Sequence, residues 1–186
     1  MPIQIGTKPH NFNDPTALMS DCHRRVEMFL GTLSAVAEFR GRLLTGDEQK
    51  SLDRALQYFR EAAPKHTADE EESLFPRLRA ISDSEVQSVL DDMAQLERDH
   101  KFAAPLHAEI DRLSQHWLRE GTLTQEYAQQ LQSAVASLVS MYRAHIEFED
   151  RVLFPLASRM LSWSQKNEIA QEMAERRELP DRARIV

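Results

Sequence analysis

The sequence contains the stretch His145-Ile146-Glu147-Phe148-Glu149-Asp150-Arg151-Val152-Leu153-Phe154-Pro155, and a near twin lies earlier at His66-Thr67-Ala68-Asp69-Glu70-Glu71-Glu72-Ser73-Leu74-Phe75-Pro76. In both copies a His is followed four residues later by a Glu, and the Glu is followed four residues later by Leu-Phe-Pro. The offset between the copies is constant at 79 residues, so they are aligned repeats. Positions i and i+4 of a helix lie on one face, about one turn apart. Each copy therefore predicts an imidazole and a carboxylate side by side on one helical stripe.

The composition favours a helical protein of one domain. The 186 residues are 41% hydrophobic, which is enough for a packed interior, and they include only five Gly and eight Pro. The net charge of −7, without any run of Lys and Arg, argues against nucleic acid as the main partner, because phosphate binding needs a basic face. We therefore expect no nucleic-acid partner.

The cysteine content and the hydropathy predict a cellular location. The chain has one cysteine, Cys22, which rules out an intramolecular disulfide framework and suits a reducing compartment. Residues 1–13 are polar and lack the apolar core of a signal peptide, and no later segment has the roughly 18 apolar residues that a membrane span needs. We expect a soluble cytoplasmic protein without a membrane partner.

Helix-start and helix-stop signals divide the chain into segments. We expect an irregular N-terminal arm at 1–13, a four-helix bundle at 14–160, and a short helix with a charged tail at 161–186. Asp14-Pro15 has the form of an N-cap followed by Pro in the first turn, and the helix that starts there is predicted to run to about Arg40 and to end at Gly41. Thr45-Gly46-Asp47 begins a second helix, and Pro64 is expected to kink it.

The later helices follow from the same signals. Ser82-Asp83-Ser84-Glu85 has the form of a capping box and predicts a third helix that ends before Gly121. Thr122 or Thr124 caps a fourth helix, and Ser162-Trp163-Ser164-Gln165 predicts a short fifth helix to about Glu178. Four long amphipathic helices joined by short connections predict an all-α fold: an up-down antiparallel four-helix bundle with a short C-terminal fifth helix.

The repeat extends to the helix before each motif. His23 and His100 are 77 residues apart, on the first and the third predicted helix, and each is followed by a basic residue. In an up-down bundle this order gives pseudo-twofold symmetry and brings four His and two Glu to the bundle axis. The predicted cluster consists of His23, His66, Glu70, His100, His145 and Glu149.

A metal site explains this cluster better than a structural core does. A single His on an apolar face is more often a hydrogen-bonded core residue than a ligand, but an ionised Glu in a core costs several kcal/mol unless it is paired or bound to metal. No Arg or Lys shares the two stripes at the same level, so a pair of divalent ions would supply the positive charge. Imidazole and carboxylate without thiolate suit iron, manganese or zinc. Six ligands predict two metals, with Glu70 and Glu149 as bridges and water or hydroxide completing the coordination.

The chain resembles the hemerythrin-like (HHE cation-binding) family over about residues 15–160, through His23, His66-x-x-x-Glu70, His100, His145-x-x-x-Glu149 and both Leu-Phe-Pro tails. The resemblance implies a four-helix bundle that holds a non-haem di-iron centre, two iron ions with an oxo or hydroxo bridge and with the carboxylates between them. Members of that family bind O2 reversibly, sense it, handle nitric oxide or peroxide, or take part in iron homeostasis.

The pattern departs from that of the oxygen-carrying hemerythrins on two helices. Their third helix offers HxxxH, whereas here His100 is followed four residues later by Ala104. Their last helix offers HxxxxD, whereas here it is HxxxE. One imidazole ligand is therefore missing, which argues against simple O2 carriage and favours redox chemistry or exogenous ligands at a more open iron.

Further residues lie near the predicted site. Glu27, four residues after His23, is either an additional ligand or partner of the ligands, or a core-edge residue paired with an Arg. His107 lies two turns after His100 on the same face, about 10 Å along the helix axis, and is a further candidate ligand. Tyr142 is placed to hydrogen-bond a bound oxygen species, or is a core Tyr with its hydroxyl at the rim. The acidic residues Asp69, Glu71 and Glu72 are expected to form a solvated face or to be helix-end charges.

The function predicted from these residues is that of a di-iron protein that binds or reduces a small oxidant, such as O2, nitric oxide or peroxide, with the help of an unidentified electron donor. An alternative of another class is iron storage or delivery, in iron homeostasis or iron-centre repair, without turnover. A ferritin-like carboxylate oxidase should show two Glu-x-x-His motifs, and only Glu97-x-x-His100 has that form. A purely structural bundle, whose His and Glu pair with one another, is the last alternative.

Overall fold

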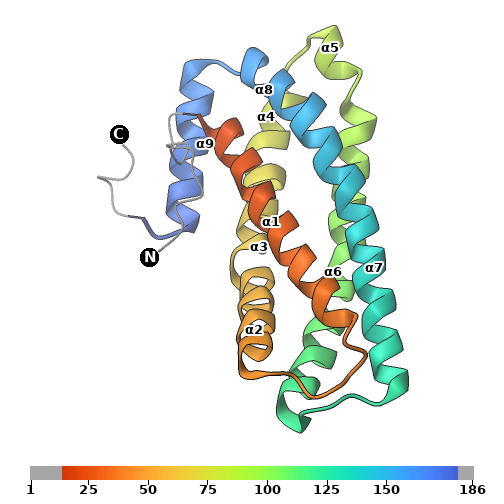
Figure 1. Cartoon of the computed structure of the whole chain (residues 1–186). Coiled ribbons are helices and arrows are strands. Elements are labelled where there is room, and N and C mark those ends of the chain that lie inside the picture. Colours follow the sequence, from red (N-terminus) through yellow and green to blue (C-terminus); the bar gives the residue numbers. More distant parts are fainter. Residues whose placement is uncertain (1–13, 180–186) are drawn as a thin grey trace.

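The computed structural model describes residues 14–179, and this range contains helices and connections without any strand. Figure 1 shows the long helices running side by side in alternating directions. They are α1 (Pro15–Ala37), α2 (Gly46–Glu61), α6 (Leu90–Glu120) and α7 (Gln125–Phe148). The predicted antiparallel four-helix bundle is therefore confirmed. The expected arm at 1–13 and the end of the expected tail, 180–186, lie outside the described residues.

Shorter helical segments extend or cover the bundle. The second long helix continues through α3 (Ala63–Ala68), η1 (Asp69–Leu74) and α4 (Phe75–Arg79), and the fourth continues through η2 (Glu149–Leu153) and α8 (Phe154–Met160). A four-residue helix, α5 (Ser84–Gln87), precedes α6, and the short C-terminal helix is α9 (Trp163–Arg176). In Figure 1 α9 lies beside the bundle, where it contacts η1 and α1. Among the described helices, none is both long and apolar enough to cross a membrane.

Most of the predicted helix starts are confirmed by their hydrogen bonds. The Asp14 side chain accepts from the backbone N–H of Ala17, with Pro15 in the first turn, and Thr124 rather than Thr122 caps α7. Capping boxes start α2 at Thr45 and α9 at Ser162. These caps satisfy backbone donors that a helix leaves unpaired at its first turn.

Two of the predicted helix boundaries are wrong. The first helix ends at Ala37 instead of about Arg40, because the chain turns through Gly41. Gly41 has a φ of 77°, and its backbone lies against Leu123: a Cβ at Gly41 would lie 2.8 Å from the Cβ of Leu123. The third helix is not capped by Ser82. Asp83 caps the short α5, and a turn that buries Val89 separates it from α6. Burial of apolar side chains outweighs local helix propensity at this end.

Proline positions shape both HxxxE segments. Pro64 lacks an N–H and would clash with a carbonyl four residues back, so α2 ends at Glu61 and the chain restarts as α3. This confirms the predicted kink. The sequence did not predict that η1 and η2 are π-helical: the backbone N–H of Phe75 donates to the carbonyl of Glu70, and that of Phe154 to the carbonyl of Glu149, each five residues back. The next residue in each copy is a Pro, which cannot continue the ordinary ladder, and single π turns are frequent at functional sites.

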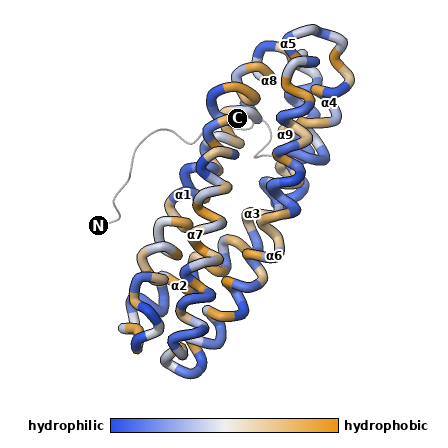
Figure 2. The backbone as a smooth tube through the Cα atoms, turned by 90° about the vertical axis from the view of Figure 1, so that its right-hand side faces the viewer, coloured by the Kyte–Doolittle hydropathy of each residue, from blue (hydrophilic) through white to orange (hydrophobic). Residues whose placement is uncertain are grey.

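The core consists of two apolar clusters with polar residues between them. Figure 2 shows hydrophobic and hydrophilic residues alternating along each helix, as expected when one face of a helix is buried. One cluster includes Val26, Ala63, Ala103 and Ile146, and the other includes Met19, Leu74, Leu96 and Leu153. On the first three long helical segments the predicted ligands fall between these two sets of positions; on the fourth, Glu149 does so and His145 directly precedes Ile146. The fold therefore brings them to one level of the bundle.

Candidate metal centre

The predicted ligands meet at one level inside the bundle. α1 contributes His23, α3 and η1 contribute His66 and Glu70, α6 contributes His100, and α7 and η2 contribute His145 and Glu149. Both Glu side chains are completely buried, and the four His side chains are between 1% and 9% exposed. Each ligand therefore comes from a rigid helical element and is shielded from bulk water.

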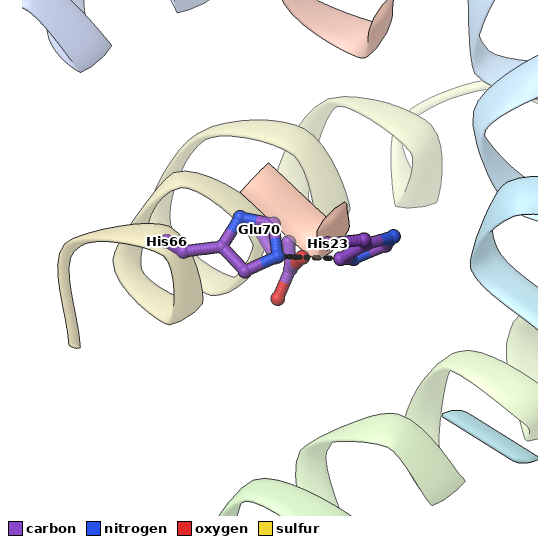
Figure 3. A group of neighbouring side chains, drawn as sticks. All are labelled: His23, His66 and Glu70. Carbon is purple, nitrogen blue, oxygen red and sulfur yellow. Dashed lines mark ion pairs between the residues drawn. The ribbon is translucent and has the colours of Figure 1, made fainter. Parts of the chain in front are cut away.

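Glu70 lies between two groups of potential ligands. On one side its Oε1 atom is 3.0 Å from Nε2 of His66 and 4.0 Å from Nε2 of His23 (Figure 3). On the other side its Oε2 atom is 3.3 Å from Nε2 of His100, and Nε2 of His145 is 3.2 Å from that nitrogen. The atoms of each group lie within 4.8 Å of one another, close enough to share one metal ion. One carboxylate thus offers an oxygen to each of two positions.

Glu149 also spans the two groups. Its Oε2 atom is 3.2 Å from Nε2 of His23, which belongs to the first group, and 3.2 Å from Nε2 of His145, which belongs to the second. The two carboxylates therefore run alongside each other between two pairs of imidazoles. Bridging carboxylates in this arrangement are typical of two-metal sites in helical bundles.

The state of the buried polar atoms fits cations at this place. Within residues 14–179, both carboxylate oxygens of Glu70, both of Glu149, and Nε2 of His23 are buried without a hydrogen-bond partner. A buried anionic oxygen without a partner is strongly unfavourable. Cations bound between the imidazoles and the carboxylates would satisfy all five atoms, so the donor set fits two metal ions.

Without a metal, protons take over the role of the cations. Burial opposes protonation of His23, but the hydrogen bond to Asp150 and the nearby Glu149 carboxylate outweigh it and raise its pKa to about 10. Burial likewise opposes protonation of His100, while contact with Glu70 raises its pKa to about 9. For Glu70, burial favours the neutral acid, yet His66 and His100 hold its pKa well below 4.5. Metal ions must therefore compete with protons for these ligands.

Comparison with known proteins agrees with this geometry. The family model described as "Hemerythrin HHE cation binding domain" matches residues 14–157. The chain belongs to this family. An uncharacterized protein of Haemophilus influenzae is 28% identical to the hemerythrin-like chain over 182 residues, and the similar region covers 97% of each protein.

Carboxylates outside the cluster orient the imidazoles of this HHE domain. The Nδ1 atom of His23 is 2.8 Å from Asp150, and that of His100 is 2.8 Å from Glu71. His145 is held more loosely, with Nδ1 3.4 Å from Asp99. Such partners fix the ring orientation of a metal-binding His and increase its basicity.

These partners were not predicted from the sequence. Glu71 was expected on a solvated face or as a helix-end charge; its side chain is 33% exposed, and it also hydrogen-bonds the His100 ring, which was not predicted. A signal was present: the residue after each Glu ligand is acidic in both repeats, Glu71 in the first and Asp150 in the second. Asp99 was less clearly indicated as the partner of His145: Asp99 is only the residue before another predicted ligand, His100.

Asp69 is not on a solvated face. It is completely buried and forms ion pairs with Arg176 at 3.0 Å and with Arg177 at 2.6 Å, at the end of α9. These contacts tie the C-terminal helix to the π turn that carries Glu70. Glu72 is exposed but pairs with Arg176 at 3.1 Å. The short fifth helix therefore braces one side of the candidate centre.

The remaining predicted residues lie around the ligands and not among them. Glu27 is 49% exposed and pairs with Arg24, as in the ion-pair alternative; Arg24 in turn pairs with Asp150. Nε2 of His107 lies 3.0 Å from the hydroxyl oxygen of Tyr142. Burial lowers the pKa of His107 to about 4, so this imidazole is neutral at pH 7.

Tyr142 connects this pair to the centre. It lines a cavity of about 10 Å³ whose walls include the four imidazoles of the cluster together with the apolar side chains Val26, Ala63 and Ile146. A cavity of this size holds about one water molecule. The centre is therefore in contact with a small, mostly apolar space.

Proposed function

We propose that this HHE-domain protein is a non-haem di-iron protein that binds or reacts with a small oxidant: O2, nitric oxide or peroxide. The observation that carries the proposal is that Glu70 offers one oxygen to each of two imidazole groups. Glu149 spans the same two groups. A mixed nitrogen and oxygen donor set without thiolate suits iron better than copper(I) or calcium. A pair of bound iron ions would supply electrons and coordination positions for the oxidant.

The residues of the chain have separate tasks in this proposal. The imidazoles and carboxylates hold the ions, and Asp150, Glu71 and Asp99 keep three of the imidazole rings in position. The apolar wall of the cavity excludes bulk water. Tyr142 points its polar group toward His107, and its position at the cavity wall makes it the residue available to hydrogen-bond a ligand there.

The size of the cavity supports a small ligand. Its volume of about 10 Å³ corresponds to about one water molecule, so it favours the smallest ligands and excludes an organic substrate of ordinary size unless the helices move apart. We propose that the partner is a diatomic molecule or peroxide, that a separate protein or small molecule donates electrons, and that the protein acts in the cytoplasm without a nucleic-acid or membrane partner.

Anaerobic reconstitution followed by optical spectroscopy tests the proposal. We expect about two iron ions per chain and a near-ultraviolet absorption after exposure to air that changes when azide, nitric oxide or peroxide is added. Tightly bound iron whose spectrum ignores every added ligand would instead support storage or delivery. An iron content near zero in a fully folded protein would contradict both functions.

A further inference from the structure

The outer nitrogen of His66 distinguishes it from the other imidazoles of the centre. The corresponding nitrogens of His23, His100 and His145 each lie against a carboxylate. Nδ1 of His66 is buried and has no hydrogen-bond partner within residues 14–179. Figure 3 shows this nitrogen turned away from Glu70. A metal at Nε2 leaves the ring proton on Nδ1, so a buried donor lacks its acceptor.

The repeat identifies the acceptor that is missing. Asp99, one residue before His100, provides the carboxylate that contacts His145. The residue at the matching place, one before His23, is Cys22. Cys22 lies near the Arg177 guanidinium, and a thiol is a weak hydrogen-bond acceptor. Among residues 14–179, this half of the centre therefore provides no carboxylate for the fourth imidazole.

A basic pocket lies at this place. It has a volume of about 280 Å³, and its lining includes His66, Cys22, Arg25 and Lys65. Neither Arg25 nor Lys65 has an anionic partner in the described part of the chain, whereas Arg177, also in the lining, is already bound to Asp69. The acidic residue of the lining, Glu61, is exposed to solvent and contacts Gln57. The pocket therefore combines two unpaired cations with an unsatisfied buried donor.

We propose that this pocket binds a small carboxylate anion, which accepts a hydrogen bond from Nδ1 of His66 and pairs with Arg25 and Lys65. The anion does for His66 what Asp99 does for His145. A carboxylate is the group that the chain itself uses at the other three imidazoles, and the pocket has room for a molecule of several heavy atoms. The proposal requires a metal at Nε2 of His66 but does not depend on a reaction with an oxidant.

The test uses the full-length protein loaded with Zn²⁺, a diamagnetic ion that accepts imidazole and carboxylate ligands. Sodium acetate is titrated at constant ionic strength against sodium chloride, and the histidine nitrogens are followed by ¹⁵N NMR. We expect saturable binding, with the largest shift at Nδ1 of His66. Arg25→Ala and Lys65→Ala should each weaken binding by about tenfold, since each removes a charge-assisted contact. Lys101→Ala, an exposed cation beside the ligand His100 and outside the pocket, is the matched control and should bind as the wild type does.

Other results would overturn the proposal. These are the absence of saturable binding, equal affinity in the Arg25 and Lys65 variants, or a shift that is confined to another histidine, which would indicate acetate bound at the metal itself. Cys22→Asp gives a further measurement, because it places a carboxylate at the position that matches Asp99. We expect it to abolish acetate binding and to shift Nδ1 of His66 without acetate. If this variant does not fold, the acetate affinities of the Arg25 and Lys65 variants still test the proposed anion site. The iron content and the optical response test the proposed function separately.

Discussion

The bundle has two halves whose ligand donors match but whose surroundings differ. The first half carries His66 and Glu70, and the second carries His145 and Glu149. Matching positions of the repeat bear different residues next to the ligands. Cys22 in the first half matches Asp99 in the second, and Leu30 matches His107. Asp69, which is buried and ion-paired, matches Phe148, which is partly buried. The contacts follow these differences. The first half is braced by α9, and the outer nitrogen of its His66 has no carboxylate partner in the part of the chain that the structure describes. The second half has the His107–Tyr142 pair.

This difference shows that the repeat preserves the donors but not the residues that position them. The two groups of potential ligands therefore share the carboxylates Glu70 and Glu149, while the residues that contact their imidazoles differ. Substitutions at matching positions should have unequal effects, and the experiments below measure how unequal the two halves are.

The largest effect is expected at the shared carboxylates. Glu70→Ala should remove nearly all bound metal, because it takes one oxygen from each ligand group, and Glu149→Ala should lose at least one of about two ions. Metal content per chain after anaerobic loading and desalting measures both. Glu147→Ala, an exposed neighbour paired with Arg151, is the control and should keep the wild-type content. Full metal content in the Glu70 variant would show that this carboxylate does not bridge.

The next largest effect is expected from the ion pairs of Asp69 with Arg176 and Arg177, which attach α9 to the first half and contribute to the free energy of unfolding. Asp69→Ala leaves Arg176 and Arg177 without their buried partner and should lower the free energy of unfolding by about 3–5 kcal/mol. Denaturant unfolding measures this. The control Asp47→Ala removes a carboxylate that is 99% exposed and should cost less than about 1 kcal/mol. A small effect at Asp69 would mean that α9 does not support the π turn.

The polar pair of the second half should make stability depend on pH. Burial lowers the pKa of His107 from 6.5 to about 4, so between these values the unfolded chain takes up a proton that the folded chain does not. Stability therefore falls as the pH drops through this window, by about 2–3 kcal/mol at pH 4.5. His107→Leu, which copies Leu30 of the first half, should lose this part of the acid sensitivity. Urea unfolding at pH 7 and pH 4.5 checks it, with His116→Gln as the control. An unchanged pH dependence would contradict the burial of a neutral imidazole.

The smallest effects are expected at the carboxylates that orient the imidazoles. Asp150→Asn and Glu71→Gln should each weaken metal binding by about 10–100-fold. The Asp150 variant should be weaker, because Asp150 is less exposed than Glu71 and also holds Ser20 and Arg24. Competition with a chelator of known affinity measures both. Equal affinity in both variants and the wild type would mean that ring orientation does not limit binding.

Much of the centre could be predicted from the sequence because its His, Glu and apolar residues recur at helical spacing. The spacing of His and Glu within each repeat places them on one helical face, and the apolar positions around them predict helices that must pack together. The bundle and the cluster His23, His66, Glu70, His100, His145 and Glu149 follow from that spacing. The helix caps at Asp14, Thr45 and Ser162 could also be predicted, because each cap depends only on residues a few positions away.

The tertiary structure decided what depends on contacts between distant segments. The π turns η1 and η2 contain Glu70 and Glu149, and the periodic pattern of the sequence does not predict them. Asp69 and Glu71 resemble surface charges in the sequence, and only the approach of α9 and α6 provides their partners, Arg176 and Arg177 for Asp69 and His100 for Glu71. The unsatisfied nitrogen of His66 likewise exists only because the fold places Cys22, and not a carboxylate, at the position that matches Asp99. Helix periodicity is a local property of the chain, whereas the pairing of buried charges is set by which helices meet.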